Sequence, residues 1–302
     1  MIRLIRAELI KLRTTNMWWI FLLCSLAFIG LALLINTAQA HQELQTPEYL
    51  NSPPPSGLPQ DQQDQILAEQ QAERDRIAAG RTAAGLALKA ANIYTSGQFF
   101  GLLLVMLLAI LLITNEFYHQ TATATFLATP KRTKVIVAKL ITGAAMAFGF
   151  WLVATAIDLV VGAIFFADEG YSNSLGHWTA QQAILLNLLL YMLWAIFGIG
   201  IGVLLRSQIG ATITAAVLYT AGTYAALIAL ALIHEYLIKE DWVMEAAVYI
   251  PSLASWHIVG TLQNQLGDVH LPPRWIGVVV MIGYAVVLGG IGTLITRKRD
   301  VA

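Results

Sequence analysis

One carboxylate stands out among the side chains of this chain that could do chemistry. Asp158 lies within the apolar run 140–166, and no other Asp or Glu lies well inside such a run. A carboxylate in an apolar environment is costly, so it usually faces protein or water and marks a path for ions or protons. Asp158 could bind a cation, carry protons, or bond to a neighbouring helix, for example through Asn187. The sequence leaves these roles open.

Other catalytic arrangements are missing from the sequence. His234 and Glu235 do not continue to the HExxH pattern of zinc hydrolases, and the single cysteine, Cys24, lies in an apolar run. One cysteine excludes an internal disulfide. No GxxxxGK[ST] segment, which would cradle nucleotide phosphates, is present. The sequence therefore predicts no catalytic residue, no metal ligand and no cofactor on this chain.

Composition places the chain in a membrane. Of its 302 residues 57% are hydrophobic and 12% are charged, with a mean hydropathy of +0.66, which is typical of an integral membrane protein. We expect a single all-α domain over residues 1–302. Its six transmembrane helices are expected over 18–35, 93–114, 140–166, 182–205, 209–233 and 275–296. We expect the first of these to be retained rather than cleaved as a signal peptide, because it is longer than a usual signal h-region.

Three segments outside the spans have a recognisable pattern. Residues 1–15 are amphipathic and predict a helix lying in the membrane interface. The outer loop 36–92 predicts a polar helix over 61–79, after which Gly85 could break a second helical piece. The segment 234–273 has apolar stretches too short to span. It predicts either broken helices that enter and leave the outer leaflet or a surface loop with amphipathic helices.

The cations indicate the orientation. Most Lys and Arg residues lie in the N-terminal 15 residues, in the loop 131–139 with Lys139 at its end, at Arg206, and at 297–299. Because cytoplasmic loops carry an excess of Lys and Arg, both termini are expected in the cytoplasm. The expected location is a bacterial-type cell membrane.

A patterned segment, Asn115 to Pro130, lies between the second and third spans. Asn115 could cap a short helix that Pro130 would end, and three cations follow. Such a cytoplasmic helix, held between two spans, could pass force to a partner outside the membrane. The alternative is an ordinary basic loop.

Together these features resemble the membrane subunit of an ABC-type exporter, the type-2 ABC permease family. The residues that carry the resemblance are Ala7-Glu8-Leu9-Ile10-Lys11-Leu12, Asn115-Glu116-Phe117 through Thr121 with Leu127, Pro130 and Lys139, Pro251-Ser252, and Arg299-Asp300-Val301. Family members usually carry an Arg after the Glu-Phe pair and often a Gly before the Thr. This chain has Tyr118 and Gln120 at those places.

The resemblance implies a permease that exports a hydrophobic or amphipathic small molecule, such as a drug, a natural product or a lipid-like compound. Two copies of a separate ATPase subunit would bind ATP and Mg and hydrolyse the ATP. A second membrane subunit, identical or homologous, would complete the assembly, with membrane lipid around it and no role for nucleic acid. The segment 115–130 would be the coupling helix. Its implied contact residues are Glu116, Phe117, Tyr118, Thr121, Phe126, Pro130, Lys131 and Arg132.

By the same resemblance, the second and fifth spans face the transport pathway. Candidate pathway residues are Tyr94, Gln98, Phe99, Phe100, Met106, Thr212, Tyr219, Thr223 and Tyr224, joined by Asp158 and Asn187. The alternative for each is helix packing, which also explains the cluster Gly198, Gly200 and Gly202. Two other functions stay open: a proton-coupled secondary transporter that uses Asp158, and a membrane scaffold that transports nothing.

Overall fold

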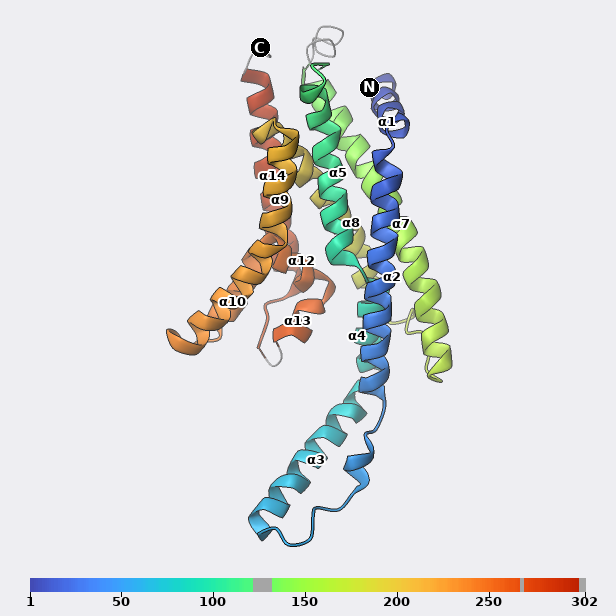
Figure 1. Cartoon of the computed structure of the whole chain (residues 1–302), viewed down its shortest axis with the longest axis vertical. Helices are drawn as coiled ribbons and strands as arrows, with labels where there is room; N and C mark the ends of the chain where they lie inside the picture. The colour runs from blue at the N-terminus through green and yellow to red at the C-terminus, as the bar shows by residue number, and fades with distance from the viewer. Residues whose placement is uncertain (122–131, 267–268, 299–302) are drawn as a thin grey trace.

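The computed structural model describes residues 1–121, 132–266 and 269–298 (Figure 1). Within these ranges the chain consists of helices joined by turns and loops, and it has no strand. Six segments are long and apolar enough to cross a membrane, which confirms the predicted all-α membrane protein. They are Met17–Asn51, Ala83–Tyr118, Thr133–Asp168, Trp178–Leu205, Gln208–Tyr236 and Arg274–Gly292.

The first two helices follow one another with only a short break between them. Helix α1 spans Ile2–Thr14 and α2 spans Met17–Leu44, so α2 passes the expected end of the first span at residue 35. The extension is favoured because residues 36–44 include good helix formers, and because Ala40 and Leu44 are buried against the bundle.

The outer loop forms an arm that projects from one end of the bundle (Figure 1). It contains a short 3₁₀ helix, η1 (Glu48–Asn51), and α3 (Gln60–Gly80), close to the helix expected over 61–79. The Arg81 guanidinium donates to the Leu44 carbonyl through Nε at 3.0 Å, and Leu50 is fully buried. These contacts attach the arm to the end of α2.

The second span consists of two helices joined at a tight bend. Helix α4 (Ala83–Tyr94) and α5 (Gln98–Tyr118) meet at Gly97, whose φ of 72° lies in the left-handed region. A Cβ on Gly97 would lie 2.7 Å from Cγ1 of Ile29, so glycine also allows α2 to approach. Gly85 does not break α4 as expected. It lies in the first turn, where its N–H donates to the capping Thr82 hydroxyl at 3.2 Å.

The third and fourth spans are unbroken. Helix α7 covers Arg132–Asp168 and α8 covers Trp178–Leu205. Helices α5 and α8 form the centre of the main core. A Cβ on Gly198 would lie 2.3 Å from the Met106 carbonyl oxygen, and one on Gly202 would lie 2.2 Å from Cγ2 of Ile113. The predicted packing role of these glycines is confirmed, because they let α8 contact the α5 backbone.

The C-terminal part is the most broken. The fifth span is α9 (Gln208–Tyr219) and α10 (Ala221–Tyr236), which meet at Thr220. Four short helices follow: α11 (Trp242–Glu245), η2 (Ala246–Tyr249), α12 (Pro251–Val259) and α13 (Thr261–Leu266). Pro251 begins α12 at its first turn, where its missing N–H costs nothing. Helix α12 packs against α8 and against the last span, α14 (Arg274–Lys298).

Candidate functional site

Helix α1 carries two charges toward the bundle. Glu8 is 4% exposed and Lys11 follows three residues later on the same face, because residues three apart are neighbours on a helix. The opposite side of α1 carries exposed residues such as Ile2 and Arg13. Glu8 points inward, against α7.

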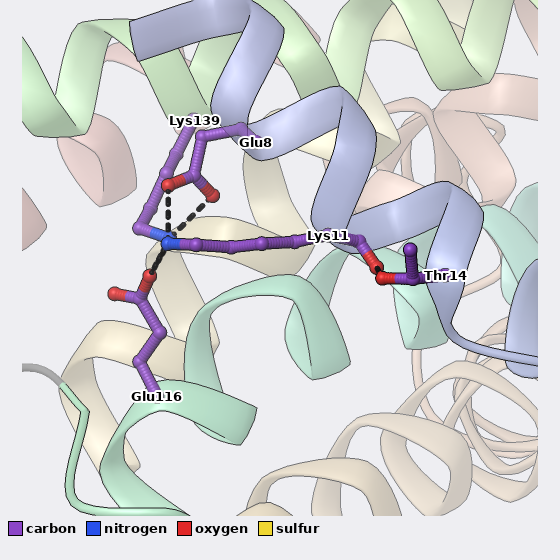
Figure 2. A network of polar contacts seen from close by, with 5 residues as sticks. All are labelled: Glu8, Lys11, Thr14, Glu116 and Lys139. Carbon is purple, nitrogen blue, oxygen red and sulfur yellow. Dashed lines mark hydrogen bonds and ion pairs between the residues drawn. The ribbon is translucent and has the colours of Figure 1, made fainter.

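Four side chains form a closed ring of ion pairs (Figure 2). Lys11 Nζ lies 2.9 Å from Glu8 Oε1 and 2.6 Å from Glu116 Oε1. Lys139 Nζ lies 2.7 Å from Glu8 Oε2 and 2.9 Å from Glu116 Oε1. Each ammonium therefore contacts both carboxylates, and the ring joins α1, the last turn of α5 and the start of α7. We call these four residues the charged ring.

Three of the four charged side chains are buried, so each needs a partner of opposite charge. The side chains of Lys139, Glu8 and Glu116 are 2%, 5% and 8% exposed, whereas that of Lys11 is 47% exposed. Removing a charge from water costs several kcal/mol per ion, and opposite charges with good geometry offset that cost. Glu116 also lies in the last turn of α5, where the helix dipole disfavours an anion. Its two cationic partners compensate for both effects.

The protonation of Lys11 reflects this setting. Desolvation lowers the pKa of Lys11, but its hydrogen bonds and charge interactions with Glu116 and Glu8 outweigh that effect. The pKa of Lys11 is therefore raised above its ordinary value, and the lysine is charged at neutral pH.

The ring corrects two expectations about the connection between the second and third spans. Asn115 does not cap a new helix, because α5 continues through Asn115, Glu116 and Phe117 to Tyr118. Lys139 does not lie in a loop, because α7 already begins at Arg132. The pairing of Glu116 and Lys139 is the physical reason, since neutralised charges no longer force the helices to end.

Helix α5 ends in a Schellman motif. The N–H of Thr121 donates to the Glu116 carbonyl at 2.9 Å, and that of Gln120 donates to the Phe117 carbonyl at 3.2 Å. Gln120 has a φ of 55°, a left-handed conformation that glycine adopts without cost. The remaining expected contact residues, Phe126, Pro130 and Lys131, lie outside the described residues, and Arg132 is described only as the first residue of α7.

An aromatic and a cation hold the end of α5 against α8. The guanidinium carbon of Arg206, the residue that ends α8, lies 5.5 Å from the centre of the Phe117 ring. This is cation–π distance. Tyr118, the next residue, is 68% exposed. Phe117 therefore serves contacts within the chain, whereas Tyr118 is available to a partner.

A cleft of about 610 Å³ opens beside the charged ring, between α1, the start of α2 and α5. Lys11 and Glu116 line its polar end, and Leu12, Met17 and Leu108 are among its apolar wall residues. A second cleft, of about 640 Å³, lies between the end of α2, α3 and α4.

Most candidate pathway residues are buried inside this one chain. Tyr94, Gln98, Met106, Tyr219 and Thr223 are each no more than 4% exposed. Four of them donate hydrogen bonds within the chain. The Tyr94 hydroxyl donates to the Asn173 carbonyl at 2.6 Å, and Gln98 Nε2 donates to the Ser255 carbonyl at 3.3 Å. The Tyr219 hydroxyl donates to the Phe99 carbonyl at 2.9 Å, and the Thr223 hydroxyl donates to Ser252 Oγ at 2.6 Å. Their role within the chain is helix packing.

A smaller set of aromatics remains partly open. The Phe99 ring centre lies 6.1 Å from that of Tyr224 and 5.6 Å from that of Trp256. Tyr224 is 52% exposed, and the other two are partly exposed. These ring contacts connect the second and fifth spans with α12. Trp256 belongs to this aromatic cluster, although the sequence analysis did not single it out. Phe100 instead stacks on Phe28 at 4.1 Å, and the Thr212 hydroxyl donates to its own helix, to the Gln208 carbonyl at 2.8 Å.

Asp158 and Asn187 are both buried, at 1% and 2% exposure. The bond between them that the sequence offered as one alternative is not formed in the described part of the chain, where Oδ1 of each has no hydrogen-bond partner. Within the described ranges, no group of three or more His, Cys, Asp or Glu side chains could hold a metal ion.

Fold and site together define the class: an all-helical membrane protein with six candidate spans, whose first helix is tied to the second and third spans by buried charges. A family model described as "Protein of unknown function (DUF2705)" matches residues 72–302. The chain therefore belongs to the DUF2705 family. A comparison with curated proteins found no match.

Proposed function

We propose that this chain is the membrane subunit of an ATP-driven exporter of the type-2 ABC permease kind. It would move a hydrophobic or amphipathic small molecule out of the cytoplasm, with ATP hydrolysed by a separate subunit. The observation that carries the proposal is the charged ring, which ties α1 and the facing ends of two spans into one unit.

The ring supports a mechanical role. A membrane chain without a nucleotide site of its own must receive free energy through contacts that differ between the states of its partner. The buried pairs from Lys139 to Glu8 and Glu116 link α7 to α1 and α5. A partner that shifts this end of the molecule would therefore move two spans and α1 together.

The same end offers a surface for that partner. Tyr118 is exposed where α5 ends, and α1 exposes Ile2 at 82% and Ile10 at 52%. Exposed aromatic residues are common anchors of protein interfaces. Helix α1, the end of α5 and the end of α14 lie together at one end of the molecule (Figure 1), which supports an orientation with both termini in the cytoplasm.

The partners follow from the same proposal. Two ATPase subunits would bind ATP and Mg, and a second membrane subunit, identical or homologous, would complete the assembly in a bacterial-type cell membrane. The partly exposed cluster of Phe99, Tyr224 and Trp256 offers an aromatic surface suited to an amphipathic substrate.

A site-specific cross-link tests the proposal. A photo-reactive amino acid replaces Tyr118 in living cells, and the matched control carries it at Tyr236, which is 76% exposed at the far end of α10. The expected product at position 118 is a soluble protein with a GxxxxGK[ST] nucleotide site, and position 236 gives no such product. Cross-links from position 118 to lipid only would contradict the proposal and favour a transporter that uses Asp158 without a partner.

A further inference from the structure

Four polar side chains lie on the packed helices α7 and α8, away from the charged ring. Thr155 and Asp158 are three residues apart on α7, and Asn187 and Tyr191 are four apart on α8, so each pair shares one helix face. The two helices pack along each other. Ala154, one turn from Asp158, and Ala180, two turns from Asn187, belong to one buried apolar cluster, so these parts of α7 and α8 line the same region of the core.

These side chains are buried and incompletely bonded. Their exposed fractions are 5% for Thr155, 1% for Asp158, 2% for Asn187 and 1% for Tyr191. Thr155 Oγ1, Asp158 Oδ1, Asn187 Oδ1 and Tyr191 Oη have no hydrogen-bond partner. A buried polar atom without a partner costs about 1–3 kcal/mol. Four such oxygens on two facing helices therefore point to a ligand rather than to packing.

The residues around these four side chains are closely packed and mostly apolar. A Cβ on Gly101 of α5 would lie 2.0 Å from Tyr191 Oη, so only glycine lets that hydroxyl reach its position. Ala154, one turn away from Asp158, belongs to an apolar cluster that includes Tyr94 and Phe166. In the described part of the chain, no Lys, Arg or His forms an ion pair with Asp158.

We propose that these four oxygens form a binding site for one monovalent cation, Na⁺. One carboxylate with three neutral oxygens is a donor set for a hard cation, because hard cations prefer oxygen ligands and softer metals prefer thiolate or imidazole. A single positive charge neutralises Asp158, whereas a divalent ion would leave a net charge in the membrane.

The depth of the cluster fits such a site. Asp158 lies ten residues before the end of α7 at Asp168, which at 1.5 Å per residue is roughly 15 Å along the helix. Cation sites of membrane transporters lie near the bilayer midplane. The inference does not depend on an ATPase partner, because it concerns oxygens within one chain.

The test is the thermal stability of the purified full chain in detergent. Na⁺ replaces choline at constant ionic strength, and the midpoint of unfolding is recorded at each concentration. Binding to the folded state only predicts a saturable rise in Tm, on the order of 2–4 °C, with a smaller effect of K⁺.

Variants connect the effect to the site. Asp158→Asn removes the charge and should abolish the Na⁺ dependence. Asp168→Asn, an exposed acid on the same helix, should keep it. Tyr191→Phe and Thr155→Val each remove one oxygen with little change of shape, so each should raise the Na⁺ concentration needed for half of the shift. These two variants keep the test valid if Asp158→Asn does not fold.

Three results would overturn the inference. The first is a wild-type Tm that is the same in Na⁺, K⁺ and choline. The second is a Tm that changes with pH but not with Na⁺, which would show that the cluster binds a proton instead. The third is a Na⁺ effect that persists unchanged in both Tyr191→Phe and Thr155→Val, because the ion would then bind elsewhere.

Discussion

The Nζ atom of Lys139 lies 2.7 Å from Oε2 of Glu8, although 131 residues separate them in the sequence. Both side chains are buried. Glu8 also contacts Lys11, and Lys139 also contacts Glu116. This pair fixes α1 against the start of α7. It holds the N-terminal helix against the bundle.

Replacing Lys139 with Met should therefore be strongly destabilising. The change leaves Glu8 and Glu116 buried with only the half-exposed Lys11, and removing one partner of a buried pair costs about 3–5 kcal/mol. The free energy of unfolding in detergent measures the loss.

The matched control is Arg13→Met, which removes an exposed cation from α1 and should change stability by no more than about 0.5 kcal/mol. Adding Glu8→Gln to Lys139→Met restores charge balance, so the double variant should lose less than the sum of the single variants. Equal stability of Lys139→Met and Arg13→Met would show that the ring is not formed.

Gly198→Ala should separate α8 from α5. The new methyl would lie 2.3 Å from the Met106 carbonyl oxygen and 2.9 Å from Cβ of Ala109, so a helix has to move. Overpacking of this kind costs about 1–3 kcal/mol. Unfolding midpoints of the purified variants measure it.

Gly149→Ala serves as the comparison on the neighbouring helix α7. No atom lies within 4 Å of the methyl it would add, and alanine stabilises a helix interior over glycine by about 0.5–1 kcal/mol. Opposite signs are therefore expected for the two substitutions. A neutral Gly198→Ala would contradict the close contact.

Gln120→Gly should stabilise the chain. Gln120 has a φ of 55° at the end of α5, and a left-handed conformation costs an L-residue about 1–2 kcal/mol. Denaturation in detergent should show a gain of about 1 kcal/mol. Tyr118→Gly, at the last residue of α5, should instead lose stability, because glycine is a poorer helix former. A loss for both would mean that the Schellman motif does not form.

The spans themselves were predictable because a helix needs about 20 apolar residues to cross the hydrocarbon core of a membrane. Their ends were not. Helix α7 begins at Arg132 rather than near residue 140 because Lys139 is neutralised by carboxylates from distant segments. The sequence showed only that Glu116 and Lys139 border apolar runs and that Glu8 lies in the amphipathic N-terminal segment, which does not show that they meet. The left-handed conformation of Gln120 at the end of α5 was not predicted, because non-glycine residues rarely adopt it.

The stability of the chain should fall in mild acid because of His257. Burial lowers the pKa of His257, and the charge of Arg274 lowers it further, while the carbonyls of Pro273 and Pro272 only partly offset these effects. The unfolded chain therefore takes up a proton below about pH 6.5 while the folded chain stays neutral. The contribution of neutral His257 to the free energy of unfolding is fully present above that pH. It is lost as the pH falls toward the lowered pKa of the folded state.

The slope can reach about 1.4 kcal/mol per pH unit for one proton. Unfolding midpoints between pH 7.5 and pH 5 measure it, and His257→Asn should flatten the profile over this range. An unchanged profile in the variant would assign the acid sensitivity to other groups.

ATP hydrolysis by the natively purified assembly tests the central proposal most directly. The chain is isolated from its membrane in mild detergent, and Mg-ATP turnover is measured together with the amount of chain. We predict turnover that co-purifies with the wild type and with Tyr236→Ala, and that falls at least tenfold in Tyr118→Ala, because truncating an interface anchor costs about 2 kcal/mol or more. Turnover that is absent from the wild type, or equal in Tyr118→Ala and Tyr236→Ala, would contradict the assignment of this end of the molecule to an ATPase partner.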